Sequence, residues 1–179
     1  MKRKVILYMS VSLDGFIAND TKNTGWVRGE HDCYQGDYGR NGFLSVVDTV
    51  VMGKNTYKEI KAKEAVRGWP YEGMKTYVVT HHPEKEPAEK NIEFVDVKMH
   101  TLIQQLQEEE GGNIWIFGGA SIVNQLMKDN LIDEYHFTII PTILGSGMRL
   151  FDDKNKEIKL HLVRCKEKNG VIDCLYEKA

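Results

Sequence analysis

The stretch "NIWIFGGASIVNQLMKD", residues 113–129, joins an apolar run to a helical pattern through two adjacent glycines, Gly118 and Gly119. Residues 113–117 carry no charge and are mostly β-branched or aromatic, which predicts a short buried strand. After the glycines, apolar residues recur at helical spacing, and Ser121 is placed to cap the start of a helix. The stretch therefore predicts a strand, a glycine turn and a helix in direct succession.

The glycine turn has two interpretations. The first residues of a helix leave backbone N–H groups unpaired, and without side chains at Gly118 and Gly119 a phosphate can approach these groups closely. Alternatively, the glycines only form a tight turn that lets the helix pack against the sheet. The stretch is not a G-x-G-x-x-G fingerprint, so residues elsewhere in the chain must decide between the two.

The composition is that of an ordinary globular protein. Of the 179 residues, 41% are hydrophobic and 28% are charged, so we expect a single domain over residues 1–179. The net charge of −2 and the lack of a basic stripe with interleaved aromatic residues argue against nucleic acid as a partner. No apolar run is long enough to span a membrane. The run after Met1–Lys4 meets Asp14 without a cleavage site, which predicts a first strand and a cytoplasmic protein.

Three cysteines, Cys33, Cys165 and Cys174, show no C-x-x-C motif and no zinc spacing. Residues 158–178 read as a hairpin around Asn169-Gly170, the strongest two-residue turn signal. That turn places Cys165 directly opposite Cys174 at a position without ladder hydrogen bonds, where the strands come closest. A disulfide is sterically possible there. We expect two free thiols instead, because the chain carries no export signal and the cytosol is reducing.

The remaining pattern alternates strands and helices. Strands are predicted at residues 5–9, 48–53, 75–80, 92–95, 113–117 and 133–144, and helices after residue 34, from Lys54, at 101–109 and after Gly119. Such alternation favours right-handed crossovers and a mainly parallel sheet covered on both faces. The C-terminal hairpin adds antiparallel strands, so the predicted sheet is mixed.

Three of the predicted strands end in small or polar residues, at Gly53, at Thr80 and at Gly118-Gly119. The carboxyl ends of parallel strands meet at one edge of the sheet, and ligands of open α/β sheets bind beyond that edge. We therefore expect the three ends to share one rim. This shared position favours a ligand-binding role for the glycines.

The turn after Gly53 supplies further polar groups. Lys54 offers a cation, and Asn55 and Thr56 offer donors beside a second helix N-terminus. The turn is therefore suited to an anion. A solvated lysine followed by an ordinary helix cap would give the same pattern.

Thr80, His81 and His82 form a third polar cluster. Adjacent histidines on an extended chain point to opposite sides, so a shared metal ion is not expected. His100 and His136 show no ligand spacing either, and we predict no metal site. A histidine beside a phosphate and a plain surface loop both remain open.

Five segments together resemble a known family. "VVMGKNTYKEI" (50–60), "KTYVVTHHP" (75–83) and "IWIFGGASIVNQLM" (114–127) look like the cofactor-binding segments of the dihydrofolate reductase-like superfamily. "SVSLDGFIA" (10–18) and "IIPTILGSGMRLF" (139–151) are more similar to its riboflavin branch, the reductase domain of bacterial riboflavin biosynthesis proteins, which reduces an aminouracil ribosyl phosphate. The resemblance covers nearly the whole chain and is carried by five motifs in register.

The resemblance implies a three-layer α/β/α fold, the cofactor NADPH and a homodimer. The diphosphate of NADPH is expected over the glycine turn and the helix that follows it, and the adenosine 2′-phosphate near Thr80. By motif matching, the expected cofactor-binding residues are Gly53, Lys54, Asn55, Thr56, Thr80, His81, His82, Gly118, Gly119, Ala120, Ser121 and Ile122.

The substrate side follows from the same resemblance. In the riboflavin branch the aspartate of the "SLDG" motif faces the nicotinamide and the substrate, so Asp14 is the expected catalytic residue and Ser12 a neighbouring substrate contact. An ordinary turn aspartate before Gly15 is the alternative. Folate reductases carry an acid on the helix after the first loop, and neither Asp32 nor Asp37 clearly has that position.

The expected activity is hydride transfer from NADPH to a small heterocyclic or carbonyl substrate, most similar to 5-amino-6-(5-phosphoribosylamino)uracil reductase. The zinc deaminase signatures H-x-E and P-C-x-x-C, which often accompany that domain, are absent from this sequence, so another heterocycle is conceivable. Two alternatives remain open: a dihydrofolate reductase, and an NADPH-binding sensor without turnover.

Overall fold

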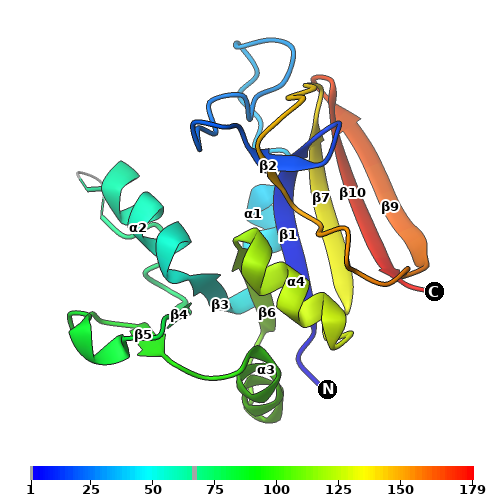
Figure 1. Ribbon diagram of the computed structural model, residues 1–179. Helices are drawn as coiled ribbons and strands as arrows, with labels where there is room; N and C mark the ends of the chain where they lie inside the picture. Colours follow the sequence, from blue (N-terminus) through cyan, green and yellow to red (C-terminus); the bar gives the residue numbers. More distant parts are fainter. Residues whose placement is uncertain (1, 66–67) are drawn as a thin grey trace.

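The computed structural model describes residues 2–65 and 68–179, which form one eight-stranded sheet with helices on both faces (Figure 1). In their order across the sheet, the strands are β5 (Ile92–Val95), β4 (Lys75–Val79), β3 (Val47–Gly53), β6 (Asn113–Gly118), β1 (Val5–Ser12), β7 (Glu134–Ile140), β10 (Val171–Lys178) and β9 (Leu160–Lys168). Neighbours from β5 to β7 are parallel, whereas β10 is antiparallel to β7 and to β9. The predicted mixed, mainly parallel sheet with a C-terminal hairpin is confirmed.

Two helical layers cover the sheet. The helices are α1 (Arg40–Leu44), α2 (Lys54–Lys63), α3 (Met99–Glu108) and α4 (Ala120–Lys128), and a short 3₁₀ helix, η1, spans Pro83–Lys85. Apolar side chains of α3 and α4 share one buried cluster with Leu7 of β1, and Phe43 of α1 and Tyr57 of α2 share a second cluster with Ile6. Because Ile6 and Leu7 are neighbours on a strand, their side chains point to opposite faces. The α/β/α layering is therefore the predicted one.

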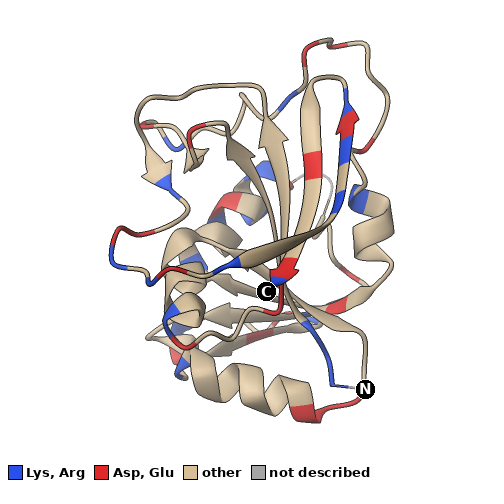
Figure 2. Ribbon diagram, turned by 90° about the vertical axis from the view of Figure 1, so that its right-hand side faces the viewer, with Lys and Arg blue, Asp and Glu red and all other residues tan. Residues whose placement is uncertain are grey.

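The central strands read as unbroken apolar runs because both of their faces are covered. Val5, Leu7, Ile114 and Ile116 are fully buried in β1 and β6. The hairpin differs, since every residue of β9 is exposed and charges of both signs lie along its strands (Figure 2). The sheet thus passes from a double-covered centre to an open edge.

Several predicted boundaries were wrong. Helix α4 begins at Ala120 with Gly119 as its N-cap, so Ser121 does not cap it; the Ser121 hydroxyl instead accepts a hydrogen bond from Gln125 at 3.3 Å. Strand β7 ends at Ile140, because the next residue, a proline, has no N–H to continue the ladder. A separate two-stranded sheet of β2 (Phe16–Ala18) and β8 (Met148–Arg149) was not foreseen.

Candidate active site

The three strand ends singled out in the sequence lie side by side. Strands β4, β3 and β6 are adjacent and parallel, so Thr80, Gly53 and Gly118 are found on one rim, as predicted. The chain turns from Gly53 directly into α2 and from Gly119 directly into α4. The rim therefore carries two helix N-termini on neighbouring strands.

The two turns pack closely against each other. A Cβ atom placed on Gly119 would lie 3.5 Å from Oγ1 of Thr56, and one placed on Gly53 would lie 3.6 Å from Cγ1 of Ile122. Neither N-cap glycine can offer a side-chain oxygen, and no side chain caps α2 or α4. The first backbone N–H groups of both helices are thus left without intrahelical acceptors at a single place. This arrangement suits a ligand with more than one negative charge.

The two glycines of the α4 turn differ in what they require. Gly118 has φ +107°, a conformation that favours glycine, and a Cβ there would lie 2.6 Å from Cε of Met9. Gly119 has φ −70°, which any residue can adopt, and its peptide bond to Gly118 is cis. Gly118 is therefore needed by the chain itself, whereas Gly119 leaves the surface above Thr56 free of a side chain.

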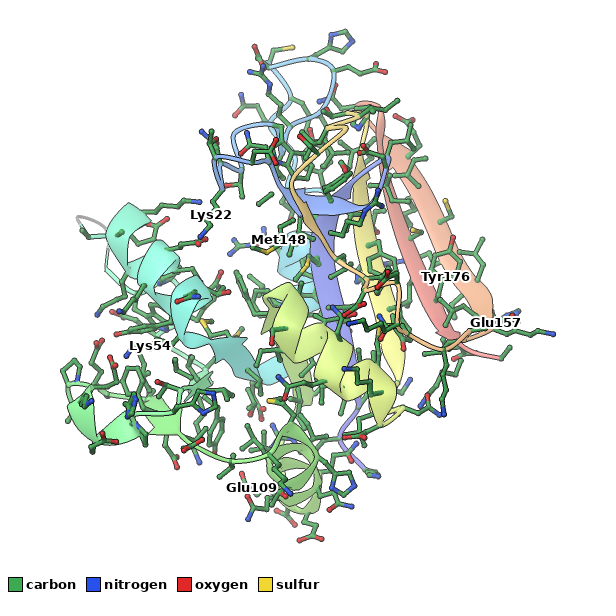
Figure 3. The ribbon with its side chains drawn as sticks, in the orientation of Figure 1. Lys22, Lys54, Glu109, Met148, Glu157 and Tyr176 are labelled. Carbon is green, nitrogen blue, oxygen red and sulfur yellow. The ribbon has the colours of Figure 1, made fainter. Side chains whose placement is uncertain are left out.

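Lys54 has a carboxylate partner. Its Nζ forms an ion pair with Glu86, which follows η1, and both side chains are largely buried. Figure 3 labels Lys54 at the start of α2, on the side of β5 and η1. The positive charge of Lys54 is therefore already paired with Glu86, while the adjacent Asn55 is exposed.

Thr80 is buried at the end of β4, and its Oγ1 accepts a hydrogen bond from the backbone N–H of His82 at 3.3 Å. The His81 ring is 92% exposed and lies 3.3 Å from Asp96, whereas the His82 ring lies 3.5 Å from Glu84. The two rings thus have different partners. Their contact with a cofactor phosphate stays a prediction.

Asp14 fastens a loop to the turn after β1. Its carboxylate accepts hydrogen bonds from the Ser12 hydroxyl at 2.6 Å and from the backbone N–H groups of Leu144 and Gly145 at 3.1 and 2.7 Å. The Ser12 hydroxyl and the two amides hold the pKa of Asp14 at about 2, below its usual 3.8. Asp14 is therefore ionised at neutral pH and is no proton donor there. Its contact with a substrate, like that of the buried Ser12, stays a prediction.

A buried polar cluster lies on the face of the sheet that α1 covers. Nε2 of His136, on β7, is 2.5 Å from Oδ1 of Asp173, on β10, and Arg164 of β9 approaches Oδ2 of that carboxylate at 3.3 Å. The ring of Tyr8 meets the His136 ring edge-on at 4.6 Å between centroids. Burial lowers the pKa of His136 and raises that of Tyr8. The sequence interpretation missed this cluster, because only the β7–β10 register brings the residues together.

The acid that a folate reductase needs on its first helix is not seen. Helix α1, Arg40–Leu44, contains no acidic residue in the described chain. Asp37 precedes α1, whose N-cap is Gly39, and its carboxylate accepts hydrogen bonds from the N–H groups of Gly39 and Asn41 at 3.0 and 2.8 Å. Asp32 is exposed beside Arg28. These contacts count against folate reduction.

A cavity of about 720 Å³ opens beside the glycine turn, between α4 and the chain after β8. It is lined by Ala120, Ser121, Asn124, Gln125, Lys128, Arg149, Phe151, Asp152 and Asp153. Nδ2 of Asn124 donates to the carbonyl of Leu150 at 3.0 Å, and its Oδ1 accepts from the N–H of Asp152 at 2.9 Å, which fixes one wall. The cavity thus extends the rim along the outer side of α4.

The family described as the RibD C-terminal domain matches residues 3–172. The chain belongs to this family. A Bacillus subtilis (strain 168) relative of this RibD C-terminal domain, "Uncharacterized protein YwjB", is 38% identical over 179 residues, which is 100% of both chains. The match confirms the predicted resemblance to the C-terminal domain of riboflavin biosynthesis proteins.

Solved structures agree with this family. The "Putative riboflavin biosynthesis protein" of Shewanella sp. PV-4 superimposes with a TM-score of 0.86 at 24% identity and covers 100% of this RibD C-terminal domain and 99% of its own chain. Acinetobacter baumannii RibD superimposes with a TM-score of 0.72 at 17% identity, over 99% of this chain and 58% of its own. At these identities the likeness shows the fold. Within the described residues, no helix is both long and apolar enough to cross a membrane.

Proposed function

We propose that this chain is an NADPH-dependent reductase of the 5-amino-6-(5-phosphoribosylamino)uracil reductase type, acting on a small heterocyclic or carbonyl substrate. The observation that carries the proposal is the pair of uncapped helix N-termini, α2 and α4, packed side by side at Gly53 and Gly119. Two adjacent anion sites fit a diphosphate better than a single carboxylate. The family match supports the same cofactor.

The residues of the rim would have distinct tasks. The backbone N–H groups at the start of α4 would bind the diphosphate, and the missing side chain of Gly119 would let it approach. Thr56 and Lys54 would complete the phosphate contacts from α2, and the end of β4, with Thr80, His81 and His82, would face the adenosine 2′-phosphate. When bound, NADPH supplies the hydride; the protein orients it and excludes water.

The substrate would lie between the nicotinamide end of that site and the turn after β1. Asp14 holds the 142–147 segment against this turn, and that segment would form one wall of the substrate site. In this proposal Asp14, as a carboxylate, positions the wall or accepts a substrate N–H. The proton for the reduced product would come from water or from the substrate's own exchangeable groups.

We also propose a homodimer in the cytoplasm. Among the described residues, Ile143 and Leu13 have the most exposed large apolar side chains, at 72% and 62%, and the Leu13 N–H bonds the carbonyl of Thr142 at 2.8 Å. This hydrogen bond brings the backbones of the two segments together, and their exposed apolar side chains would be covered by a second copy of the chain. Light scattering coupled to gel filtration should give twice the chain mass; a monomer at micromolar concentration would contradict the dimer.

Gly119→Ala tests the cofactor site. Because Gly119 has an ordinary φ and its Cβ would make only a 3.5 Å contact, the variant should fold normally, yet the methyl group would occupy the diphosphate approach. We expect NADPH to bind at least about tenfold more weakly, the loss of one hydrogen bond to a charged group. Gly73→Ala is the matched control, because nothing lies within 4 Å of its Cβ position.

Circular dichroism and NADPH binding of the Gly119→Ala protein are measured together. Unchanged circular dichroism with weakened NADPH binding supports the proposal. A folded Gly119→Ala protein with wild-type NADPH affinity would mean that the glycine turn only lets α4 pack against the sheet. Fluorescence titration of NADPH reports the affinity directly and requires no substrate.

A sensor without turnover is the second candidate. The observation that favours it is that both carboxylate oxygens of Asp14 already accept hydrogen bonds from groups of this chain, so Asp14 has a structural task that needs no substrate. NADPH oxidation should be followed with a panel of pyrimidine and carbonyl compounds. Binding of NADPH without oxidation by any of them would favour the sensor over the reductase.

A further inference from the structure

Two thiols face each other across the C-terminal hairpin. Cys165 of β9 pairs directly with Cys174 of β10, and both are free. Asn169 and Gly170, with φ +55° and +74°, form the two-residue turn that fixes this register. In a hairpin with a two-residue turn, the pair that flanks the turn, here Lys168–Val171, exchanges ladder hydrogen bonds, and the following pairs alternate. Cys165–Cys174 is the third pair beyond it and therefore has no ladder hydrogen bonds.

The separation at such a pair suits a disulfide. Opposite Cα atoms at a non-hydrogen-bonded pair lie about 4.5 Å apart, and disulfides bridge Cα atoms about 4.4–6.8 Å apart. Directly opposite side chains also point to the same face of the sheet, so the two Sγ atoms share one side of the hairpin. The bond can therefore form without a change in register.

The two thiols differ in their access to solvent. Cys165 lies on the edge strand β9 and is exposed, whereas Cys174 is 1% exposed and its thiol lies 3.6 Å from the carbonyl oxygen of Phe137. Burial raises the pKa of the Cys174 thiol. A reagent in solution can thus reach Cys165 and is kept from Cys174.

We propose that Cys165 and Cys174 form a thiol–disulfide exchange site for low-molecular-weight disulfides, with Cys165 as the attacking thiol and Cys174 as the resolving thiol. The Cys165 thiolate attacks one sulfur of the small disulfide, which releases one small thiolate and leaves a mixed disulfide on Cys165. The Cys174 thiol then loses its proton and attacks Sγ of Cys165, which releases the second small thiol. One small disulfide is reduced to two thiols, and the two cysteines are oxidised to one disulfide.

The bond would fasten the open edge of the sheet. Strand β9 is an edge strand that pairs with β10 within the described sheet, and the residues next to the cysteines, Arg164 and Asp173, already form an ion pair at 3.3 Å. Oxidation would close the loop of residues 165–174 and hold Arg164 over the His136–Asp173 pair. The inference does not depend on the proposed reductase activity.

The test uses the whole chain with Cys33→Ser, which removes the other exposed thiol. The folded protein is incubated with oxidised glutathione, quenched with N-ethylmaleimide and weighed by intact-mass spectrometry. We expect a product that is lighter by two hydrogens and carries no maleimide, with Cys165 and Cys174 in one linked peptide. Its melting temperature should rise by about 5 °C, as for the closure of a short loop.

Two further variants assign the roles. Cys174→Ser should stop at a mixed disulfide between Cys165 and glutathione, and Cys165→Ser should leave Cys174 unmodified in the folded protein. If the serine at position 174 destabilises the fold, Cys174→Ala gives the same readout. A stable mixed disulfide in the protein that retains both cysteines, or two thiols that glutathione disulfide leaves reduced, would overturn the proposal.

Discussion

At the scale of single residues, the fold gives partners to side chains that look isolated in the sequence. Asp14 carries three hydrogen bonds from Ser12, Leu144 and Gly145, and His136 has a carboxylate neighbour, Asp173, 37 positions later. Asp14 was expected at a reacting centre, and His136 was expected to have no role as a ligand. Each residue now has a physical task that can be measured.

Asp14→Asn should loosen the 142–147 segment. An amide can accept through its single oxygen, and its NH₂ group would face backbone N–H groups that need an acceptor. We expect faster hydrogen exchange at the amides of Leu144 and Gly145, with NADPH affinity unchanged. Asp32→Asn, an exposed aspartate near Arg28, is the matched control. Unchanged exchange at both amides would remove the anchoring role.

The same variant separates anchoring from catalysis. If Asp14 also accepts a hydrogen bond from the substrate, turnover should fall by about one to two decades, the loss of one hydrogen bond to a charged group. Faster amide exchange with wild-type turnover would show that the predicted catalytic role is wrong and that Asp14 serves the loop alone.

His136 should make stability depend on pH. Burial lowers its pKa in the folded state below the usual 6.5, with Asp173 opposing and Arg164 assisting that shift. A group with a lowered folded pKa contributes its full stability above the unfolded pKa, and this contribution is lost as the pH falls. We expect the free energy of unfolding in urea to decrease between pH 7 and pH 5. His136→Gln should flatten that part of the profile; an equally steep profile in the variant would assign the effect to other groups.

At the scale of elements, the two turns at Gly53 and Gly119 show what sequence patterns can and cannot predict. Apolar periodicity located the strands, the helices and the shared rim, because parallel strands covered on both faces leave a clear pattern. The ion pair of Lys54 with Glu86 was not predictable, since it depends on how the chain after β4 folds back toward α2. The short β2–β8 pair was missed for the same reason, as two- and three-residue strands leave no period to detect.

The Lys54–Glu86 pair predicts opposite effects of two substitutions. Lys54→Ala should weaken NADPH binding by about one to two decades, because a charge-assisted contact is lost, and should affect NADPH more than NADH. Glu86→Gln removes the competing carboxylate and should strengthen NADPH binding. Lys61→Ala, at the other end of α2 and paired with Glu89, is the control. If all three variants bind NADPH alike, Lys54 does not contact the cofactor.

At the scale of the whole molecule, one arginine joins distant parts of the chain. The Arg3 side chain is 3% exposed; it donates to the carbonyls of Leu106 and Gly112 at 3.1 and 2.6 Å and pairs with Asp48. These partners lie on α3, on the turn before β6 and on β3. The sequence shows Arg3 only as part of a basic N-terminal run, because its partners are separated from it by 45 or more positions.

Arg3→Met should lower the free energy of unfolding by about 2–4 kcal/mol, because buried carbonyls lose a charged donor and gain none. The free energy of unfolding of Arg3→Lys should lie between those of Arg3→Met and the wild type, since an ammonium group lacks the planar fork that reaches several acceptors. Lys2→Met, at an exposed neighbouring position, should change little. Urea denaturation measures all three, and a loss below about 0.5 kcal/mol for Arg3→Met would contradict a structural role.

The central place of β1 sets the order in which the molecule can be completed during synthesis. Strand β1 leaves the ribosome well before its two neighbours, β6 and β7, whose paired residues begin at Ile114 and end at Ile140. A nascent chain that has not yet reached Ile140 therefore holds an apolar strand with at least one open edge. Such a strand is a binding site for chaperones and a seed for aggregation. Translational pausing before residue 140 should thus lower the yield of soluble protein more than pausing within the hairpin that follows.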